Sequence, residues 1–330
     1  MQAIFYDRQG PAREVLQSGE LPTPEPGPGE LRVRIHASAV NPSDTKTRSG
    51  WGGAPMPFPR IVPHQDGAGV IDAVGAGVDA ARVGERVWVY EAQRGRAFGT
   101  AADCTVVPAA HAVRLPDGVD FDTGACLGIP ALTAHRALFA DGPLAGRAVL
   151  VQGGAGAVGL AAVLLARWAG AHVLATVSRP EQAAAARAAG AHVTIDRRAE
   201  DVAARVREET AGAGVDRIVE VDLAANLAVD LDCLAANGVV SSYAASAPDA
   251  AASLPVRRAM TQGAVLRTLL VYTMGAQAHA DAVRDVSACL RAGAYRPAIG
   301  LRLPLARAAE AHEAQDSGSV VGKIVLDVGR

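Results

Sequence analysis

From residue 147 onward, short apolar strands alternate with Ala-rich helical segments, and this alternation restricts the chain to few folds. Strands are predicted at AVLVQ (148–152), HVLATV (172–177), HVTI (192–195), DRIVEV (216–221), GVVSSY (238–243) and VLRTLLVY (265–272). Ala-rich segments with helical character separate most of them. Such alternation builds a parallel sheet with helices on both faces. This part of the chain is therefore predicted to be a doubly wound α/β domain.

The residues before this region have a different pattern, which predicts a mostly β domain. Short β-branched segments are separated by Gly, Pro and Asp turns: LRVRIHASAV (31–40), AGVIDAVG (68–75), ERVWVY (85–90) and CTVV (104–107). From residue 121, FDTGACLGIPALTAHRALF has apolar residues at helical spacing. A helix in LARAAEAHEAQ (305–315) and a strand in KIVLDV (323–328) could close either domain.

Length and composition exclude several classes of protein. The 330 residues suffice for two domains, and half of them are apolar without any continuous apolar run of eighteen, which argues against membrane-spanning and disordered chains. A net charge of −2 gives no electrostatic reason to expect nucleic acid or a membrane surface as partner. The start, MQAIFYDRQG, has no secretion signal. The cysteines form no CxxC pair and fit reduced thiols, so we expect a cytoplasmic protein with Cys104, Cys126, Cys233 and Cys289 as ordinary buried or semi-buried residues.

A glycine-rich turn follows the first strand of the alternating region. In QGGAGAVGLAAVLLARWAGA, three glycines satisfy the GxGxxG pattern: Gly154, Gly156 and Gly159. A strand precedes the pattern, a helix follows it, and a second strand begins about twenty residues on, as a dinucleotide-binding turn requires. The glycines allow the tight turn, the approach of a pyrophosphate and the packing of helix on sheet, while helix N–H groups face the phosphates. The turn therefore predicts dinucleotide binding.

The end of the second strand indicates which dinucleotide is bound. NAD enzymes usually place an acid there for the ribose hydroxyls, whereas NADP enzymes offer cations and small hydroxyl residues to the 2′-phosphate. This chain reads ATVSRPEQ, with Ser178 and Arg179 at the turn and no acid before Glu181. Arg197, just after the third strand, could add a second charge. Both arginines could instead be solvated surface residues, but the missing acid favours NADPH.

Six segments, in order along almost the whole chain, resemble the zinc-free quinone oxidoreductases (zeta-crystallin-like) of the medium-chain dehydrogenase/reductase superfamily. They are HASAVNPSDTKTRSGW, PHQDGAGVIDAVG, LGIPALTAHRAL, VLVQGGAGAVGLAAVLLARWAGAHVLATVS, EVDLAANLAVDLDCL and GKIVLDV. The resemblance implies a GroES-like β-rich catalytic domain from residues 1–121 and 297–330, and a Rossmann NADPH-binding domain from 122–296. It also implies a cleft where the nicotinamide meets the substrate, and a homodimer formed through the strand near 265–272.

The resemblance also implies the site residues, by position in this chain. The catalytic candidates are Asn41, Lys46 and Lys323. The expected cofactor contacts are Asn41, Thr133, Gly154, Ala155, Gly156, Ala157, Val158, Gly159, Ser178, Arg179, Arg197, Asn226, Tyr243, Ala244, Ala245, Ser246, Leu269, Leu270, Val271 and Lys323. Relatives often have a tyrosine at the position of Lys46 and an aromatic residue or histidine at that of Arg197. Thr133 and Lys323 could be structural, and Asn226 could instead be the N-cap of a helix in LAVDLDCL.

The segment IVPHQDGAG raises the question of a metal site. Zinc-dependent members of the superfamily hold catalytic zinc with a Cys, the His of a Gly-His-Glu motif and a second Cys or comparable ligand. The resemblance places Asn41, Gln65 and Ile129 at these positions, with His64 one residue out of register. Amides and an aliphatic side chain cannot replace these ligands, so we expect no metal. The histidines at 36, 111, 135, 172, 192, 279 and 312 are scattered and are interpreted as structural or surface residues.

Hydride transfer from NADPH to a conjugated acceptor suits a site without metal, because the cofactor performs most of that chemistry itself. We therefore expect a zinc-independent reductase of a quinone or enone, with Asn41, Lys46 and Lys323 donating hydrogen bonds to the developing oxyanion and solvent supplying the proton. An enoyl-thioester or alkenal reductase is the alternative enzyme. A crystallin-like protein that binds cofactor with little catalysis is the alternative from another class.

Overall fold

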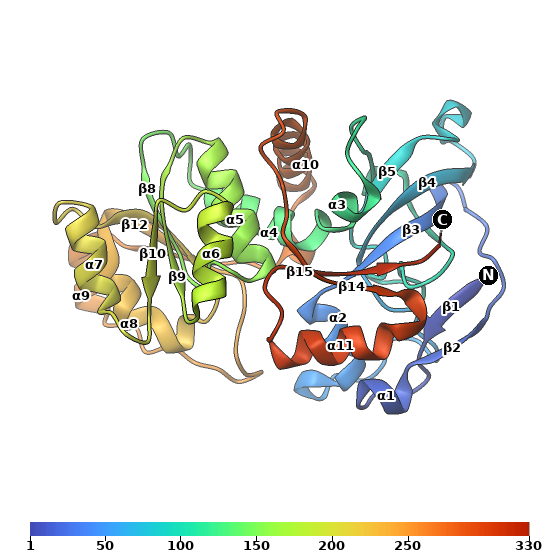
Figure 1. Ribbon diagram of the computed structural model, residues 1–330, viewed down its shortest axis with the longest axis horizontal. Coiled ribbons are helices and arrows are strands. Elements are labelled where there is room, and N and C mark those ends of the chain that lie inside the picture. The colour runs from blue at the N-terminus through green and yellow to red at the C-terminus, as the bar shows by residue number, and fades with distance from the viewer. Residues whose placement is uncertain (330) are drawn as a thin grey trace. The chain divides into compact units, whose positions relative to one another are not determined.

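The computed structural model describes residues 1–329, which form two compact units (Figure 1). One unit contains Met1–Ile129 and the segment from Ile299 onward, and the other is Pro130–Ala298. The C-terminal helix and strand thus belong to the first unit. The domain ranges predicted from the sequence end at residues 121 and 296, eight and two residues before these divisions. None of the helices within residues 1–329 is long and apolar enough to cross a membrane.

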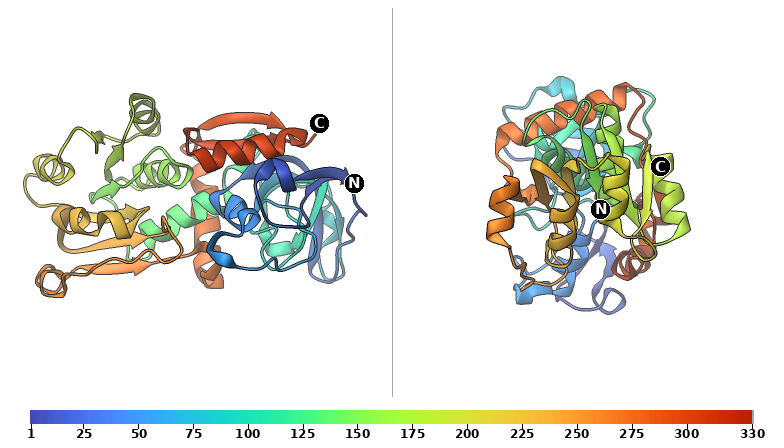
Figure 2. Two further views of the ribbon diagram at one scale, coloured as in Figure 1. Left: turned by 90° about the horizontal axis from the view of Figure 1, so that it is seen from below. Right: turned by 90° about the vertical axis from the view of Figure 1, so that its left-hand side faces the viewer.

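The second unit contains a six-stranded parallel sheet in the order β10-β9-β8-β11-β12-β13. This order is that of a doubly wound dinucleotide-binding sheet, which confirms the predicted fold class. Helices α5 and α6 pack on strands β8, β9 and β10, whereas α7 and α8 contact each other; Figures 1 and 2 show helices on both faces. The strands are β8 (Ala148–Val151), β9 (His172–Val177), β10 (Val193–Asp196), β11 (Val215–Glu220), β12 (Leu234–Ser242) and β13 (Val265–Thr268). The helices are α5 (Ala157–Trp168), α6 (Pro180–Ala188), α7 (Val202–Glu209), α8 (Leu223–Cys233), α9 (Val256–Gln262) and α10 (Ala276–Arg291).

Strand β13 is shorter than the sequence predicts. The apolar run suggests a strand over 265–272, but β13 ends at Thr268, which pairs with Ser242, the last residue of β12. Beyond Ser242 the neighbouring strand offers no further ladder, and the chain continues as a 3₁₀ turn at Val271–Thr273. Apolar residues alone therefore did not decide the length of this strand.

The first unit is built on a seven-stranded sheet with the path β14-β15-β3-β4-β5-β7, and β6 also pairs with β3. Strand β3 joins β4, β6 and β15 in antiparallel pairs, so chain segments far apart in sequence meet along it. The strands are β1 (Gln2–Phe5), β2 (Gln17–Glu20), β3 (Glu30–Val40), β4 (Asp66–Val74), β5 (Arg86–Val89), β6 (Cys104–Pro108), β7 (Ala112–Arg114), β14 (Ile299–Pro304) and β15 (Lys323–Asp327). The helices are α1 (Ala12–Val15), α2 (Pro42–Ser49), α3 (Phe121–Ala125) and α11 (Ala308–Ser317), and α4 (Gly128–Phe139) begins here and continues into the second unit.

Each unit has its own apolar core. In the second unit, Leu150, Leu174 and Ile218 lie between the sheet and helices α7 and α8 together with Val206 and Leu231. The first unit buries its strands β3, β4 and β5 against one another and a second cluster beneath α11. The four cysteines are free thiols at buried positions, as expected.

Candidate active site

The glycine turn lies between β8 and α5, as the sequence predicts. Gly156 is the residue that precedes α5, with φ −74° and ψ 166°, and the positive φ of the turn (68°) falls at Gly153. A Cβ at Gly154 would lie 2.6 Å from the Cβ of Ala175 on β9, and a Cβ at Gly159 would collide with the Gly153 carbonyl oxygen. Two of the three glycines therefore allow close packing within the unit.

Gly156 differs from the other two glycines. A Cβ at this position would have only the Gly153 carbonyl oxygen near it, at 3.6 Å. No protein atom thus requires a glycine here, whereas a ligand that approaches the start of α5 would. Unpaired N–H groups at a helix N-terminus favour a phosphate. The turn fits a dinucleotide pyrophosphate, for which residues 155–158 are the predicted contacts.

A buried polar network under the turn was not predicted from the sequence. The Thr176 hydroxyl accepts a hydrogen bond from the Gly153 N–H (3.0 Å) and donates to the Gln152 side chain (2.8 Å). Gln152 donates in turn to Asp230 (2.9 Å), and burial together with Glu220 raises the pKa of Asp230 to about 8. Polar residues inside otherwise apolar strands and helices, such as Thr176 in HVLATV, were the available signal. Through the bond from the Gly153 N–H to Thr176, this buried network holds the backbone of the turn in place.

The end of β9 carries the residues expected at a 2′-phosphate. Arg197 donates from Nε to the Ser178 hydroxyl at 2.8 Å, so the structure brings these two together. Arg179 directly precedes α6 and forms an ion pair with Glu181, with 2.9 Å between Nε and Oε1. The Ser178 N–H donates to Gln182 (2.8 Å). Two guanidinium groups and a hydroxyl therefore belong to one turn region, and the Glu181 carboxylate, whose ion pair with Arg179 was not predicted, competes with a phosphate for that arginine.

The remaining expected residues of the second unit vary in position. Asn226 lies inside α8, whose N-cap is Asp222, so its interpretation as an N-cap was wrong; its amide donates to Glu220 (2.9 Å). Ser246 donates to Asp222 (3.2 Å), and Ala244 and Ala245 are exposed beside it. Tyr243 is partly buried. In the segment after β13 the Leu269 N–H donates to the Ser242 carbonyl oxygen, Leu270 is half exposed and Val271 is buried. Thr133 is buried in α4.

In the first unit, three buried side chains from distant parts of the chain meet. Asp66, at the start of β4, accepts from the Asn41 amide (2.8 Å) and from the Ile129 N–H (2.9 Å). The Lys323 ammonium, at the start of β15, lies 3.4 Å from Asp66 and also donates to the Asn41 amide oxygen. We call Asn41, Asp66 and Lys323 the Asp66 cluster. Each side chain is at least nine-tenths buried, and a Cβ at Gly128 would collide with the Asp66 carboxylate.

A second carboxyl group lies next to the Asp66 cluster. The Asn41 N–H donates to Asp44 (2.7 Å) at the first turn of α2, and one Asp44 oxygen has no hydrogen-bond partner. Burial raises the pKa of Asp44 to about 7, and the nearby Asp66 charge acts in the same direction. Burial also raises the pKa of Asp66, although the Lys323 ammonium and the donors from Asn41 and Ile129 oppose this shift. The lysine charge is therefore matched by Asp66, while Asp44 is partly protonated near neutral pH.

Lys46 lies outside the Asp66 cluster. Its ammonium is 4.1 Å from the ring centroid of Trp51, and burial lowers its pKa. Trp51 begins a short 3₁₀ helix (Trp51–Gly53) after α2 and is 38% exposed. Of the three predicted catalytic residues, the structure thus joins Asn41 and Lys323 directly and holds Lys46 against an aromatic ring.

The positions that hold zinc in zinc-dependent relatives carry side chains already engaged with other groups. The Gln65 amide donates to Gln93 (3.2 Å) and accepts from its N–H (3.2 Å). Asn41 is bonded to Asp66 and Lys323, and Ile129 offers no donor atom. Within residues 1–329 no three His, Cys, Asp or Glu side chains are grouped as a metal would need. The donor set present here does not fit catalytic zinc.

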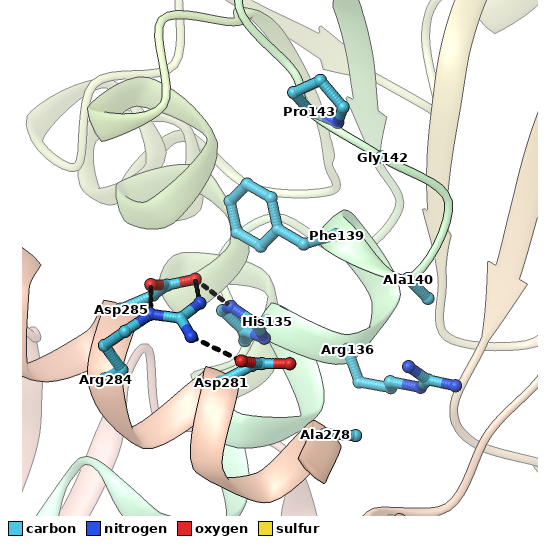
Figure 3. Close-up of a pocket in the computed structure, with 10 residues that line it drawn as sticks. All are labelled: His135, Arg136, Phe139, Ala140, Gly142, Pro143, Ala278, Asp281, Arg284 and Asp285. Atoms are coloured by element: carbon cyan, nitrogen blue, oxygen red, sulfur yellow. Dashed lines mark hydrogen bonds and ion pairs between the residues drawn. The ribbon is translucent and has the colours of Figure 1, made fainter.

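A separate pocket of about 330 Å³ lies between α4 and α10 in the second unit (Figure 3). His135 is buried in its wall and hydrogen bonds to Asp285 (2.8 Å), and Arg284 ion-pairs with Asp281 and Asp285. Its charged side chains are mostly paired with one another. None of the predicted site residues lines this pocket.

Known proteins share both units of this chain. Residues 27–117 match the family model of the alcohol dehydrogenase GroES-like domain, and residues 157–288 match that of the zinc-binding dehydrogenases. A quinone oxidoreductase of Lama guanicoe is 32% identical over 291 residues, covering 87% of this chain and 85% of the relative. A 2-haloacrylate reductase of a Burkholderia species is 32% identical over 99% of this chain and 98% of its own. The structure of the Escherichia coli quinone oxidoreductase complexed with NADPH is similar at a TM-score of 0.84 and 26% identity, over 99% of this chain and 100% of that one.

Proposed function

Because the chain belongs to the quinone oxidoreductases of the medium-chain dehydrogenase/reductase superfamily, we propose that it transfers hydride from NADPH to a quinone or similar conjugated carbonyl acceptor without zinc. The observation that carries this proposal is the Asp66 cluster. In it the buried Lys323 ammonium contacts the amide of Asn41, the residue that the resemblance sets at a ligand position of zinc-dependent relatives. An acceptor that is already polarised by conjugation needs such donors but no Lewis acid.

The second unit holds the cofactor, and NADPH supplies the hydride when it is bound. The N–H groups at the start of α5 bind the pyrophosphate, and Gly156 keeps that approach open. Ser178, Arg179 and Arg197 bind the 2′-phosphate, because two planar cations and a hydroxyl match its charge and oxygens. The segments from Tyr243 to Ser246 and from Leu269 to Val271, with Asn226 and Thr133, line the rest.

The first unit supplies the groups that act on the acceptor. Asn41 and Lys323 donate to the oxygen on which negative charge develops, and Asp66 holds the Lys323 ammonium in place. Lys46, held over Trp51, is a further donor. Solvent delivers the final proton, so the reaction requires no obligatory general base.

Reduction of an activated carbon–carbon double bond is the second candidate. The relative that matches 99% of this chain is named a 2-haloacrylate reductase, and its named substrate has a double bond conjugated with a carboxylate. The same donors stabilise charge on the conjugated oxygen when hydride enters at the β-carbon. Alkenals and enoyl thioesters belong to this class.

Assembly and location complete the proposal. Strand β13 forms an edge of the six-stranded sheet, and Met260, Val265 and Leu270 are exposed on and beside it. An exposed edge with apolar side chains favours pairing with a second copy, and we propose a homodimer through β13. Four buried free thiols fit a cytoplasmic protein.

Steady-state assays of the purified protein test the function. NADPH oxidation with 1,2- or 1,4-quinones, and little with alkenals or enoyl thioesters, is the expected result. Faster turnover of the double-bond substrates would select the second candidate. Tight NADPH binding without turnover of any acceptor would point to a crystallin-like binding protein, and one mole of zinc per subunit bound near Gln65 would overturn the zinc-free mechanism.

A further inference from the structure

A continuous chain of buried hydrogen bonds links helix α11 to the backbone of Asp66. His312 on α11 contacts His64 through their Nε2 atoms at 2.9 Å, and His64 Nδ1 lies 2.8 Å from the Ser38 hydroxyl. Ser38 is 2.7 Å from the Thr100 hydroxyl, which donates to the Asp66 carbonyl oxygen at 2.6 Å. The four side chains are fully buried. His64 has a φ of 82°, an uncommon conformation for a residue with a side chain.

The number of available hydrogens fixes which group donates and which accepts in each of these hydrogen bonds. A carbonyl oxygen can only accept, so Thr100 donates its one hydroxyl hydrogen to Asp66 and must accept from Ser38. Ser38 then has no hydrogen left and accepts from His64 Nδ1–H. A neutral His64 ring therefore presents a bare Nε2.

The remaining contact determines the state of His312. Its Nε2–H donates to the bare Nε2 of His64, which leaves His312 Nδ1 as a lone pair. That atom is indeed buried without a partner. The opposite direction would leave a buried N–H donor without a partner, which proteins tolerate less readily than an unpaired acceptor. Burial lowers the pKa of both rings, that of His312 to about 3, so both are neutral.

We infer that His312, His64, Ser38 and Thr100 are positioning residues: their one-directional chain holds the Asp66 backbone and so sets the Asp66 carboxylate against Asn41 and Lys323. The inference deepens the proposed function, on which its catalytic consequence rests. The carbonyl that Thr100 holds and the carboxylate that holds Asn41 and Lys323 belong to the same residue. A shift of the Asp66 backbone therefore moves both proposed donors.

The wild-type tautomers are measured first, by nitrogen-15 NMR of the imidazole rings. We expect His64 to carry its proton on Nδ1 and His312 on Nε2; the reverse pair, or a charged ring at pH 7, overturns the inference. Thr100→Val then removes the terminal hydroxyl at constant shape. The Asp66 carbonyl oxygen then loses its donor, and the Asn41 side-chain amide resonance should move.

Catalysis provides the second readout. Thr100→Val should lower kcat about tenfold and leave the Kd of NADPH unchanged, while Thr100→Ser keeps the hydroxyl and restores both the Asn41 resonance and kcat. Thr105→Val is the matched control. Thr105 is equally buried in the same unit, but its hydroxyl donates to the Phe98 carbonyl oxygen and takes no part in the hydrogen bonds between His312 and Asp66. An unmoved Asn41 resonance and a normal kcat in Thr100→Val would refute the positioning role. A wild-type protein that turns over no acceptor would refute the proposed function, and the tautomers and the Asn41 resonance would still decide the inference.

Discussion

The glycine turn of the second unit and the Asp66 cluster of the first handle charge in opposite ways. The turn offers backbone N–H groups, and the space at Gly156 exists because a side chain is absent. The cluster holds a carboxylate, an ammonium and an amide against one another in a buried place. A backbone site needs little from its own side chains, whereas a buried ion pair cannot lose one partner without leaving the other uncompensated. Damage to the turn should therefore cost ligand affinity, and damage to the cluster should cost stability.

The largest effect is expected at the centre of the cluster. Asp66→Ala leaves the buried Lys323 ammonium without its carboxylate and the Ile129 N–H without an acceptor. Breaking one side of a buried ion pair costs about 3–5 kcal/mol, and the free energy of unfolding in urea should fall by that amount. Asp72→Ala is the control, since Asp72 on the same strand pairs with Arg32 near the surface and should lose less than about 1 kcal/mol. Equal losses would remove the distinction between the two regions.

The turn should respond in the opposite manner. In Gly156→Ala the backbone angles suit alanine and no protein atom is closer than 3.6 Å to the new methyl group, so stability should be unchanged. The methyl group would occupy the proposed approach to the pyrophosphate, and the Kd of NADPH should rise about a hundredfold, as calorimetry can measure. Gly275 precedes α10 with nearly the same angles (φ −69°, ψ 158°) and open space around it. Gly275→Ala should therefore change neither quantity; unaltered NADPH binding in Gly156→Ala would contradict the assignment of the turn.

Acid should separate the two regions further, because backbone N–H groups do not titrate whereas the histidines behind the Asp66 cluster do. Burial depresses the pKa of His312 from its usual 6.5 to about 3, so the unfolded chain binds a proton at pH 5 that the folded chain does not. This difference is absent above about pH 7 and lowers stability as the pH falls from 6.5 toward 3. Between pH 7 and pH 5 the wild type should lose about 2 kcal/mol more than His312→Gln in urea unfolding. Parallel pH profiles would show that His312 is not buried as a neutral ring.

The same contrast explains what could be predicted from the sequence. The turn depends on the local spacing of Gly154, Gly156 and Gly159 between a strand and a helix, and local spacing is readable. The Asp66 cluster joins residues up to 282 positions apart, and only the antiparallel pairing of β15 and β4 with β3 brings them together. Lys323 and Asn41 were predicted through resemblance rather than through spacing. No sequence pattern predicted the hydrogen bond between His64 and His312, because that contact depends on where α11 packs.

The smallest effect is expected at Arg179, where a charge near the surface modifies the cofactor site. Arg179→Ala removes one of the two cations proposed to bind the 2′-phosphate and frees Glu181, so the KM for NADPH should rise about tenfold while that for NADH changes little. Arg187→Ala, at an exposed position on α6, controls for loss of a positive charge. Glu181→Gln should act in the opposite sense, since Arg179 then has no carboxylate beside it and is free to bind phosphate. Equal changes for NADPH and NADH in Arg179→Ala would mean that this turn does not distinguish the two cofactors, and that backbone binding at the glycine turn accounts for the affinity alone.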